Sequence, residues 1–294
     1  RKSALLAHFS PQEFMRGSLR ALVLSPCVVL CLRQIALPQP SLLSRSTHTS
    51  ISLQRRPKAS TSTRRAMSTS ASSSESRIAY LHGFASSATS LKGVALQKAV
   101  GTEICDLPDL NRPSFSKLTV SGALEAMDEL HEQRGRPKWN LVGSSMGGHV
   151  AALWTSLHPE CVEKLVLLCP AFSLAELWPA ILGAENFERW GREGEYPFQN
   201  AAGEWHKVHY GLVEDGLTHP VHPSIPDSVP VLVMHGKNDE VVPVASSLSL
   251  SKIYALHPSL SVETLEDDHA LFASTDLIVQ RAAQFFGVPG KRGG

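Results

Sequence analysis

The sequence predicts an α/β fold in which a mainly parallel sheet is covered by helices on both faces. From residue 77 onward, short apolar runs of strand length alternate with longer segments of helical character. The apolar runs are nearly continuous, as in strands that are buried on both faces. Strands that alternate with helices form parallel sheets, so both observations predict the same architecture.

The elements follow in chain order. Residues 119–133 form a clear amphipathic pattern, because Leu124, Met127 and Leu130 lie on one helical face. Residues 139–142 form an apolar strand that turns directly into an alanine-rich helix. Strands are expected at residues 78–81, 103–107, 139–142, 164–168, 230–234 and 260–265, and helices at 91–100, 119–133, 146–158 and 276–286.

The alternation fails between residues 171 and 226. This segment contains three of the five tryptophans, Trp178, Trp190 and Trp205, together with scattered glycines and prolines. Because it follows one predicted strand and precedes the next, it is expected to form a lid inserted over the sheet. The sequence therefore predicts one α/β domain at residues 77–288 that carries this insertion, and a flexible tail at 289–294.

The first 76 residues differ in composition from the rest of the chain. They are rich in Ser, Thr and Arg, and Glu13 is the one acid among residues 1–74. Residues 45–65 have the composition of a transit peptide, which predicts a targeting leader and a location in a plastid or mitochondrion. The alternatives are a secretory or bipartite signal that starts near Met15, a disordered or untranslated extension, and a cytoplasmic form that starts at Met67.

Composition and charge narrow the range of partners. The 28 basic and 27 acidic residues give a formal net charge of +1, which does not favour nucleic acid as a partner. The apolar run at residues 21–32 is too short and too interrupted for a stable membrane span. Of the five cysteines, two lie in the N-terminal stretch, and the other three, Cys105, Cys161 and Cys169, are interpreted as reduced core thiols of an intracellular protein; no Cys/His cluster has metal-ligand spacing. The oligomeric state stays open.

The candidate nucleophile lies in a turn between a strand and a helix. Residues 143–147 read Gly-Ser-Ser-Met-Gly, a full G-x-S-x-G motif. Its glycines let the strand and the helix approach closely, and the turn lifts the central hydroxyl above the sheet. The motif is short, but an apolar strand precedes it and a helix follows it, which favours Ser145 as nucleophile. Ser144 is rejected because Val142 stands where a glycine would be needed; the alternative is a plain Gly/Ser turn that caps the helix.

The general base and its orienting acid are expected on late loops. His269 lies between the last predicted strand and the last helix, and Asp239 lies in the loop after residues 230–234. The chain order Ser, Asp, His is the order of an α/β hydrolase. The neighbouring Glu240 is expected to point to solvent. The competing histidines are His235, in a His-Gly turn, and His257, which is expected to cap a helix end.

The remaining parts of this chemistry are two backbone donors for an oxyanion. They are expected to be the N–H groups of Met146, directly after the nucleophile, and of Phe84, after the strand at residues 78–81. His269 would take the proton of Ser145 as the hydroxyl attacks an acyl carbonyl, and water would then hydrolyse the acyl-enzyme. This mechanism requires no metal and no organic cofactor.

Four segments together resemble the small YqiA-like esterases of the α/β-hydrolase superfamily. The resemblance covers residues 77–286 and implies the α/β-hydrolase fold and hydrolysis of esters and acyl thioesters by Ser145, Asp239 and His269. The leader is outside the family pattern, and an organellar eukaryotic member would explain it. The segments are YLHGFASS at residues 80–87, NLVGSSMGG at 140–148, LVLLCPAF at 165–172 and HGKNDEVVP at 235–243.

The substrate is expected to be a small acyl ester or thioester. Phe172, Trp178 and Trp190 of the predicted lid are candidate substrate-binding residues, although packing of the lid's own core is an equally good account of each of them. Two alternatives remain open for the function. The same triad could cleave an amide, a lactone or a C–C bond, or the chain could be a non-catalytic ligand-binding homologue.

Overall fold

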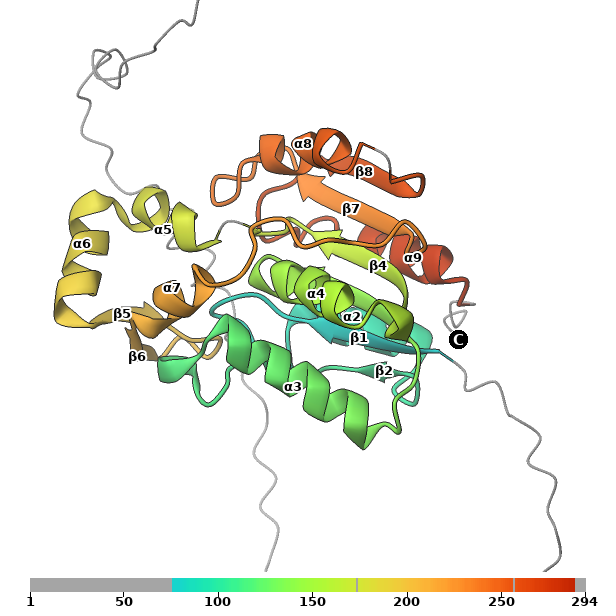
Figure 1. The fold of residues 1–294 in the computed structure, drawn as a ribbon, viewed down its shortest axis with the longest axis horizontal. Helices are drawn as coiled ribbons and strands as arrows, with labels where there is room; N and C mark the ends of the chain where they lie inside the picture. The colour runs from blue at the N-terminus through green and yellow to red at the C-terminus, as the bar shows by residue number, and fades with distance from the viewer. Residues whose placement is uncertain (1–75, 173, 256, 289–294) are drawn as a thin grey trace, which may run out of the picture.

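The computed structural model describes residues 76–172, 174–255 and 257–288 (Figure 1). The predicted leader, apart from its last residue, and the predicted tail lie outside the described residues. The plastid, mitochondrial and cytoplasmic locations, which depend on the leader, therefore stay predictions.

A six-stranded sheet forms the centre of the described chain. Its order is β2-β1-β3-β4-β7-β8, and every neighbouring pair is parallel. This arrangement confirms the predicted fold class. The strands are β1 (Arg77–Leu81), β2 (Cys105–Asp106), β3 (Trp139–Ser144), β4 (Val162–Leu168), β7 (Val231–Gly236) and β8 (Leu260–Leu265).

Helices cover both faces of this sheet. On one face, α3 (Val120–Gln133), α4 (Met146–Leu157) and α8 (Val244–Ile253) contribute to one hydrophobic cluster with the strands. On the other face, α2 (Leu91–Val100) and α9 (Thr275–Phe286) contribute to a second cluster. Two short 3₁₀ helices, η1 (Phe115–Lys117) and η2 (Pro159–Cys161), lie in connections. Both sheet faces are thus buried, which is why the strands read as continuous apolar runs.

Local chemistry explains where several helices begin and end. The side chain of Thr119 caps α3, because its hydroxyl accepts the N–H of Gly122 at 2.9 Å. The buried residues of α3 include Leu124 and Met127, as its pattern predicted. Helix α9 ends at Phe286, and the residue that follows, Gly287, has a φ of 74°, the left-handed conformation that glycine adopts readily.

Two elements differ from the sequence prediction. The strand expected at residues 103–107 is only Cys105–Asp106, at the edge of the sheet, and its Asp106 carboxylate pairs with Arg77 and Arg134. Helix α8 was not predicted. Four of its ten residues are serines, which favour turns and caps over helix interiors, so helix formation there depends on packing.

The segment between β4 and β7 folds as a separate layer at one end of the sheet (Figure 1). A third hydrophobic cluster joins its aromatic residues to Met146 and Leu118 of the main domain. No helix in the described part of the chain is long and apolar enough to cross a membrane. The elements of the insertion are α5 (Leu174–Leu182), α6 (Ala184–Glu193), the antiparallel pair β5 (Glu195–Gln199) and β6 (Trp205–His209), and α7 (Gly211–Gly216).

Candidate active site

Ser145 lies in a strained turn between β3 and α4. Its φ of 55° and ψ of −119° are outside the regions that L-residues normally occupy. A Cβ on Gly143 would lie 2.3 Å from the carbonyl oxygen of Gly147, and a Cβ on Gly147 would lie 2.2 Å from that of Leu81. Both positions therefore require glycine, and the backbone holds the Ser145 side chain at the carboxyl end of the sheet.

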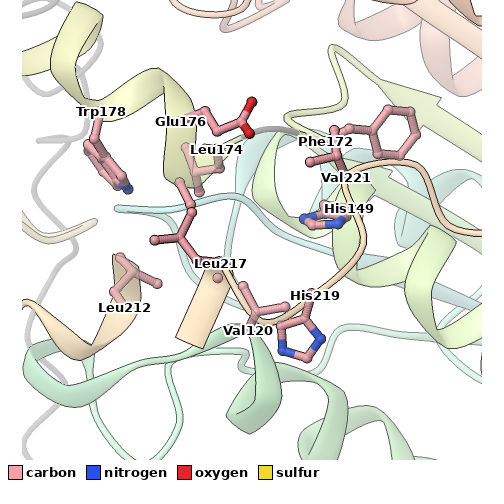
Figure 2. A pocket seen from close by; sticks show the side chains of 12 residues that line it. Val120, His149, Phe172, Leu174, Glu176, Trp178, Leu212, Leu217, His219 and Val221 are labelled. Atoms are coloured by element: carbon pink, nitrogen blue, oxygen red, sulfur yellow. The ribbon is translucent and has the colours of Figure 1, made fainter. Parts of the chain in front are cut away.

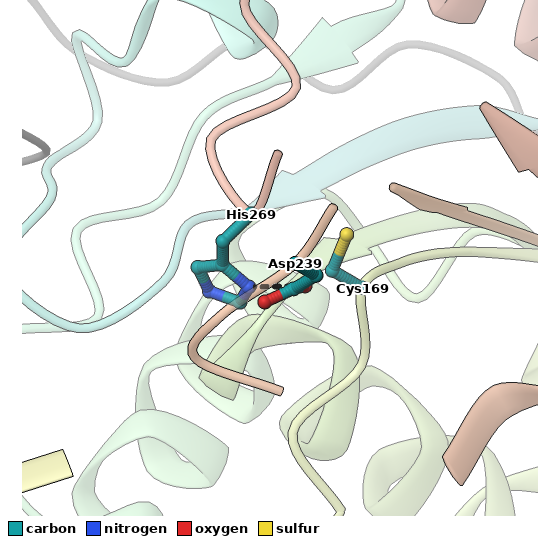
Figure 3. Close-up of side chains that lie close together, drawn as sticks. All are labelled: Cys169, Asp239 and His269. Atoms are coloured by element: carbon teal, nitrogen blue, oxygen red, sulfur yellow. Dashed lines mark hydrogen bonds and ion pairs between the residues drawn. The ribbon is translucent and has the colours of Figure 1, made fainter. Parts of the chain in front are cut away.

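Ser145, His269 and Asp239 form a hydrogen-bonded chain. The Nε2 atom of His269 lies 3.0 Å from Ser145 Oγ. The Nδ1 atom of His269 lies 2.7 Å from Asp239 Oδ2, and Figure 3 shows this second contact. A carboxylate can only accept, so Nδ1 carries the proton and the Nε2 lone pair faces the hydroxyl. The His269 side chain is 16% exposed and that of Asp239 is fully buried. This is the geometry of a general base beside a nucleophile.

The Asp239 carboxylate is held as an anion. Its Oδ1 accepts the N–H groups of Val241 and Val242 at 2.9 and 2.8 Å. Burial alone would raise the pKa of this carboxyl, but hydrogen bonds from His235 and His269 outweigh burial and hold the pKa well below its usual range. Asp239 is therefore ionised at neutral pH and can stabilise a positive charge on His269.

The loop after β1 passes close to Ser145. A Cβ on Gly83 would lie 3.2 Å from Ser145 Cβ, so only glycine leaves this approach unobstructed, and Phe84 follows directly. Met146 is the first residue of α4, where backbone N–H groups have no helical acceptor. The two predicted oxyanion donors thus belong to segments that border the nucleophile. His82 is buried, and its Nε2 accepts the N–H of Leu110 at 3.0 Å, which agrees with a structural role.

The thiol of Cys169 lies beside the side chains of Asp239 and His269. The sulfur of Cys169, a carboxylate oxygen of Asp239 and a ring nitrogen of His269 lie within 4.8 Å of one another (Figure 3). Burial, and secondarily the Asp239 charge, raise the pKa of the Cys169 thiol far above its usual range, so the thiol stays protonated. A metal here would need a thiolate and would displace the Nδ1 proton that His269 donates to Asp239. The three side chains fit a hydrogen-bonded cluster better than a metal site.

The candidate substrate residues occupy two different environments. Trp190 has no exposed surface, and its Nε1 donates to the Val208 carbonyl at 2.9 Å, so it packs the core of the insertion and presents nothing to a substrate. Phe172 and Trp178 line a pocket instead (Figure 2). Trp178 also contacts Phe84 edge to face, with ring centroids 5.2 Å apart.

The pocket lies between the insertion and the main domain, and sequence analysis did not identify most of its lining. Its cavity volume is about 60 Å³, its lining is largely apolar, and it does not include the triad residues themselves. His149 of its lining lies four residues after Ser145 on α4, about 6 Å further along the helix axis. Helical spacing from Ser145 was the one available signal for it. The other lining residues are Val120, Leu174, Ala175, Glu176, Leu212, Gly216, Leu217, His219 and Val221.

The pocket histidine predicts an acid-sensitive stability. His149 is 3% exposed, its Nε2–H donates to the Pro220 carbonyl at 3.0 Å, and burial lowers its pKa to about 4. The unfolded chain, with a histidine pKa near 6.5, takes up the proton first as the pH falls. The free energy of unfolding should therefore decrease between pH 6.5 and 4, by about 3 kcal/mol from this residue alone.

This decrease can be measured by urea unfolding at pH 7 and pH 4. The His149→Gln variant keeps a donor for Pro220 but does not titrate, so its free energy of unfolding should fall by about 3 kcal/mol less than that of the wild type over this interval. Equal losses in the two proteins would contradict a buried neutral histidine.

Part of the chain is similar in sequence to curated proteins of other organisms. The monoacylglycerol lipase abhd6-B of Xenopus laevis is 33% identical over 98 residues, which are 31% of this chain and 29% of the relative. The human monoacylglycerol lipase ABHD6 is 31% identical over 101 residues, or 32% of this chain and 30% of the relative. The chain thus aligns with less than a third of the length of these relatives.

Solved structures show the same fold over most of the chain. The mouse alpha/beta hydrolase domain-containing protein 10 has a TM-score of 0.56 at 20% identity and covers 74% of this chain and 91% of its own. Est1E of Butyrivibrio proteoclasticus, solved with bound ferulic acid, has a TM-score of 0.59 at 19% identity and covers 75% and 91%. At these identities the likeness shows the α/β-hydrolase fold alone.

One family matches most of the described residues. Its description is "Uncharacterised protein family (UPF0227)", and the match runs over residues 77–286, from β1 to the end of α9. The chain therefore belongs to the UPF0227 family.

Proposed function

We propose that this protein is a serine esterase that cleaves carboxylic esters or acyl thioesters through an acyl-enzyme. One observation carries the proposal: Ser145, held at a φ of 55°, lies 3.0 Å from His269, which lies 2.7 Å from a buried Asp239. A structural serine would not need this strain, and the strain is typical of a nucleophile turn. The monoacylglycerol lipase names of the curated relatives agree with this activity, since a lipase of that kind cleaves an ester bond.

In the acylation step, Ser145 Oγ attacks the carbonyl carbon of the substrate while His269 Nε2 takes the hydroxyl proton. The C=O bond becomes a C–O⁻ single bond, and the N–H groups of Met146 and Phe84 stabilise the negative oxygen. As the tetrahedral intermediate collapses, the bond to the leaving oxygen or sulfur breaks, and His269 returns the proton to it. Asp239 stabilises the imidazolium while His269 carries the extra proton.

Deacylation repeats the cycle with water. His269 takes a proton from a water molecule, the resulting hydroxide attacks the acyl-enzyme, and the proton returns to Ser145 Oγ as the acid leaves. The net reaction is addition of one water across the ester or thioester bond.

A fluorophosphonate probe tests the nucleophile directly. The wild-type protein should gain the mass of one phosphonyl group at Ser145, located by peptide mass spectrometry. A screen over acyl esters, acyl-CoA thioesters, lactones and amides should then show turnover chiefly of esters or thioesters. Labelling with turnover of amides only would assign another bond, and absence of labelling would favour a ligand-binding homologue.

The apolar pocket is the proposed site for the acyl chain. Each methylene that leaves water contributes about 0.8 kcal/mol, or about fourfold in kcat/KM when desolvation is complete. With p-nitrophenyl esters, kcat/KM should rise from acetyl to butyryl or hexanoyl and then level off as the pocket fills. A steady decrease from acetyl onward would contradict an acyl pocket.

Two alanines of α5 make a matched pair for this test. Ala175 lines the pocket, whereas Ala180 is exposed on the same helix. The Ala175→Phe variant should shift the preference toward shorter acyl chains, because the new ring occupies pocket volume, and Ala180→Phe should keep the wild-type profile. Identical profiles for the two variants would place the acyl chain elsewhere.

A further inference from the structure

His235 is a buried histidine to which the proposed reaction assigns no step. It lies near the end of β7, and its side chain has no exposed surface. Its Nε2 atom is 2.9 Å from the Val242 carbonyl oxygen and 3.0 Å from Asp239 Oδ2, and its Nδ1 atom is 2.7 Å from Ser247 Oγ on α8. It therefore touches the orienting acid of the triad but not the nucleophile.

The neighbours of His235 determine which ring nitrogen carries the proton. A carbonyl and a carboxylate only accept hydrogen bonds, so Nε2, which faces both, must be the donor. The Nδ1 atom is then an acceptor, and the hydroxyl of Ser247, itself 1% exposed, donates to it. The two acceptors at Nε2 thus fix the tautomer that directs an N–H toward Asp239, and the Ser247 hydroxyl anchors the ring at Nδ1.

The Asp239 carboxylate is consequently shared between two imidazoles. His235 and His269 both donate to Oδ2, while Val241 and Val242 donate to Oδ1. Each additional donor stabilises the anion and lowers the negative charge that Asp239 offers to His269. The hydrogen bond from His235 lowers the pKa of Asp239 at least as much as the one from His269.

We propose that His235 is a positioning residue for the triad: with its Nε2–H directed by its two acceptors and its Nδ1 anchored by Ser247, it holds the Asp239 carboxylate in line with His269 and moderates the basicity of His269. The kinetic part of this inference rests on the proposed esterase function. The effect on the protonation of His269 does not, because it depends only on the hydrogen bonds among the side chains.

Other ionisable groups near the carboxylate do not replace this effect. The Cys169 thiol, at the end of β4, faces Asp239 but stays neutral because its burial raises the pKa. The Lys92 ammonium of α2 donates to the Ala270 carbonyl, next to His269, and is present in the wild type and the variants alike. Removal of the His235 imidazole therefore takes away one of the two imidazole donors at Oδ2 and increases the negative charge that Asp239 offers to His269.

Four variants test the proposal. In His235→Leu, the acid limb of the kcat/KM profile should move up by about one pH unit, because His269 holds its proton more tightly. Its kcat should fall about ten- to a hundredfold with KM within about twofold, because a displaced carboxylate misorients the base and no substrate contact is lost. His235→Gln, whose amide can replace the Nε2–H donor, should stay within about threefold of the wild type.

The remaining variants examine the hydroxyl that anchors the ring. Ser247→Ala should shift the acid limb in the same direction as His235→Leu but less far, because the ring loses the hydrogen bond at Nδ1 that holds its Nε2–H against Asp239. Ser249→Ala, which removes a hydroxyl from the same helix, should match the wild type. Equal impairment of the Gln and Leu variants, or an unchanged profile in Ser247→Ala, would mean that His235 only fills the core and would overturn the proposal.

An NMR titration of the His269 ring separates this inference from the proposed function. A higher midpoint for His269 in His235→Leu than in the wild type supports the inference even if no ester is hydrolysed, and an unchanged midpoint overturns it even if esterase activity is high. If His235→Leu does not fold, the same titration of Ser247→Ala against Ser249→Ala decides: a higher midpoint supports the inference, and an equal midpoint overturns it.

Discussion

Replacement of Ser145 by alanine is expected to lower kcat by at least about 10⁴-fold, because it removes the hydroxyl that lies 3.0 Å from His269 Nε2. The fold should be retained, since alanine keeps the Cβ and the change removes one half-buried hydroxyl. The measurements are steady-state hydrolysis of the best ester and fluorophosphonate labelling followed by intact mass. Activity above a few per cent of the wild type would refute Ser145 as the nucleophile.

Ser144 provides a matched control one residue away. The Ser144→Ala variant also loses one serine hydroxyl, at the last residue of β3, and should keep activity within about threefold.

A third variant measures the strain of the turn. Ser145→Gly should also be inactive, but its free energy of unfolding should rise by about 1–3 kcal/mol, because glycine adopts a φ of 55° without steric cost.

Replacement of Asp239 by asparagine is expected to lower kcat by about 10⁴-fold. The carboxylate accepts four N–H groups, two on each oxygen, and a neutral amide must turn its own NH₂ toward one of these pairs. It also lacks the charge that stabilises the His269 imidazolium. The expected signature is a large loss of kcat with little change in KM, measured from pH 5 to 9.

The neighbouring acid is the control for this prediction. Glu240 is exposed and lies in the same loop, so Glu240→Gln removes one charge from the same segment and should change kcat by less than about threefold. If the Glu240 variant were the more severely impaired of the two, Glu240 would be the orienting acid.

Sequence patterns of short range predicted much of the fold. The G-x-S-x-G turn could be recognised because its two glycines and its serine lie within five residues, and the strand and the helix that it joins are its immediate neighbours in the sequence. Helices α2, α3 and α4 were predicted to within one or two residues, since apolar spacing or composition marks each of them. The loops of Asp239 and His269 were predicted from chain order, and the structure brings both side chains to Ser145. Their catalytic roles remain predictions.

Features that depend on contacts between segments far apart in the sequence could not be predicted from the sequence. Helix α8 is rich in serine and depends on packing against the sheet, and the tryptophans of the insertion could not be assigned to core or pocket from composition. The structure buries both rings, but Trp190 donates to Val208 of β6 inside the insertion, whereas Trp178 lines the pocket and contacts Phe84 of the main domain.

By itself, the sequence determined the class of the fold, the strained turn and the three residues that meet there. Those features depend on periodicity, on glycine and on chain order, all of which are local or one-dimensional. Only the tertiary structure decided that His235 shares Asp239 with His269 and that His149 lies at an apolar pocket. These contacts join β7 to α8 and α4 to the insertion, and a hydrogen bond between elements distant in the chain depends on distances and burial that no residue pattern records.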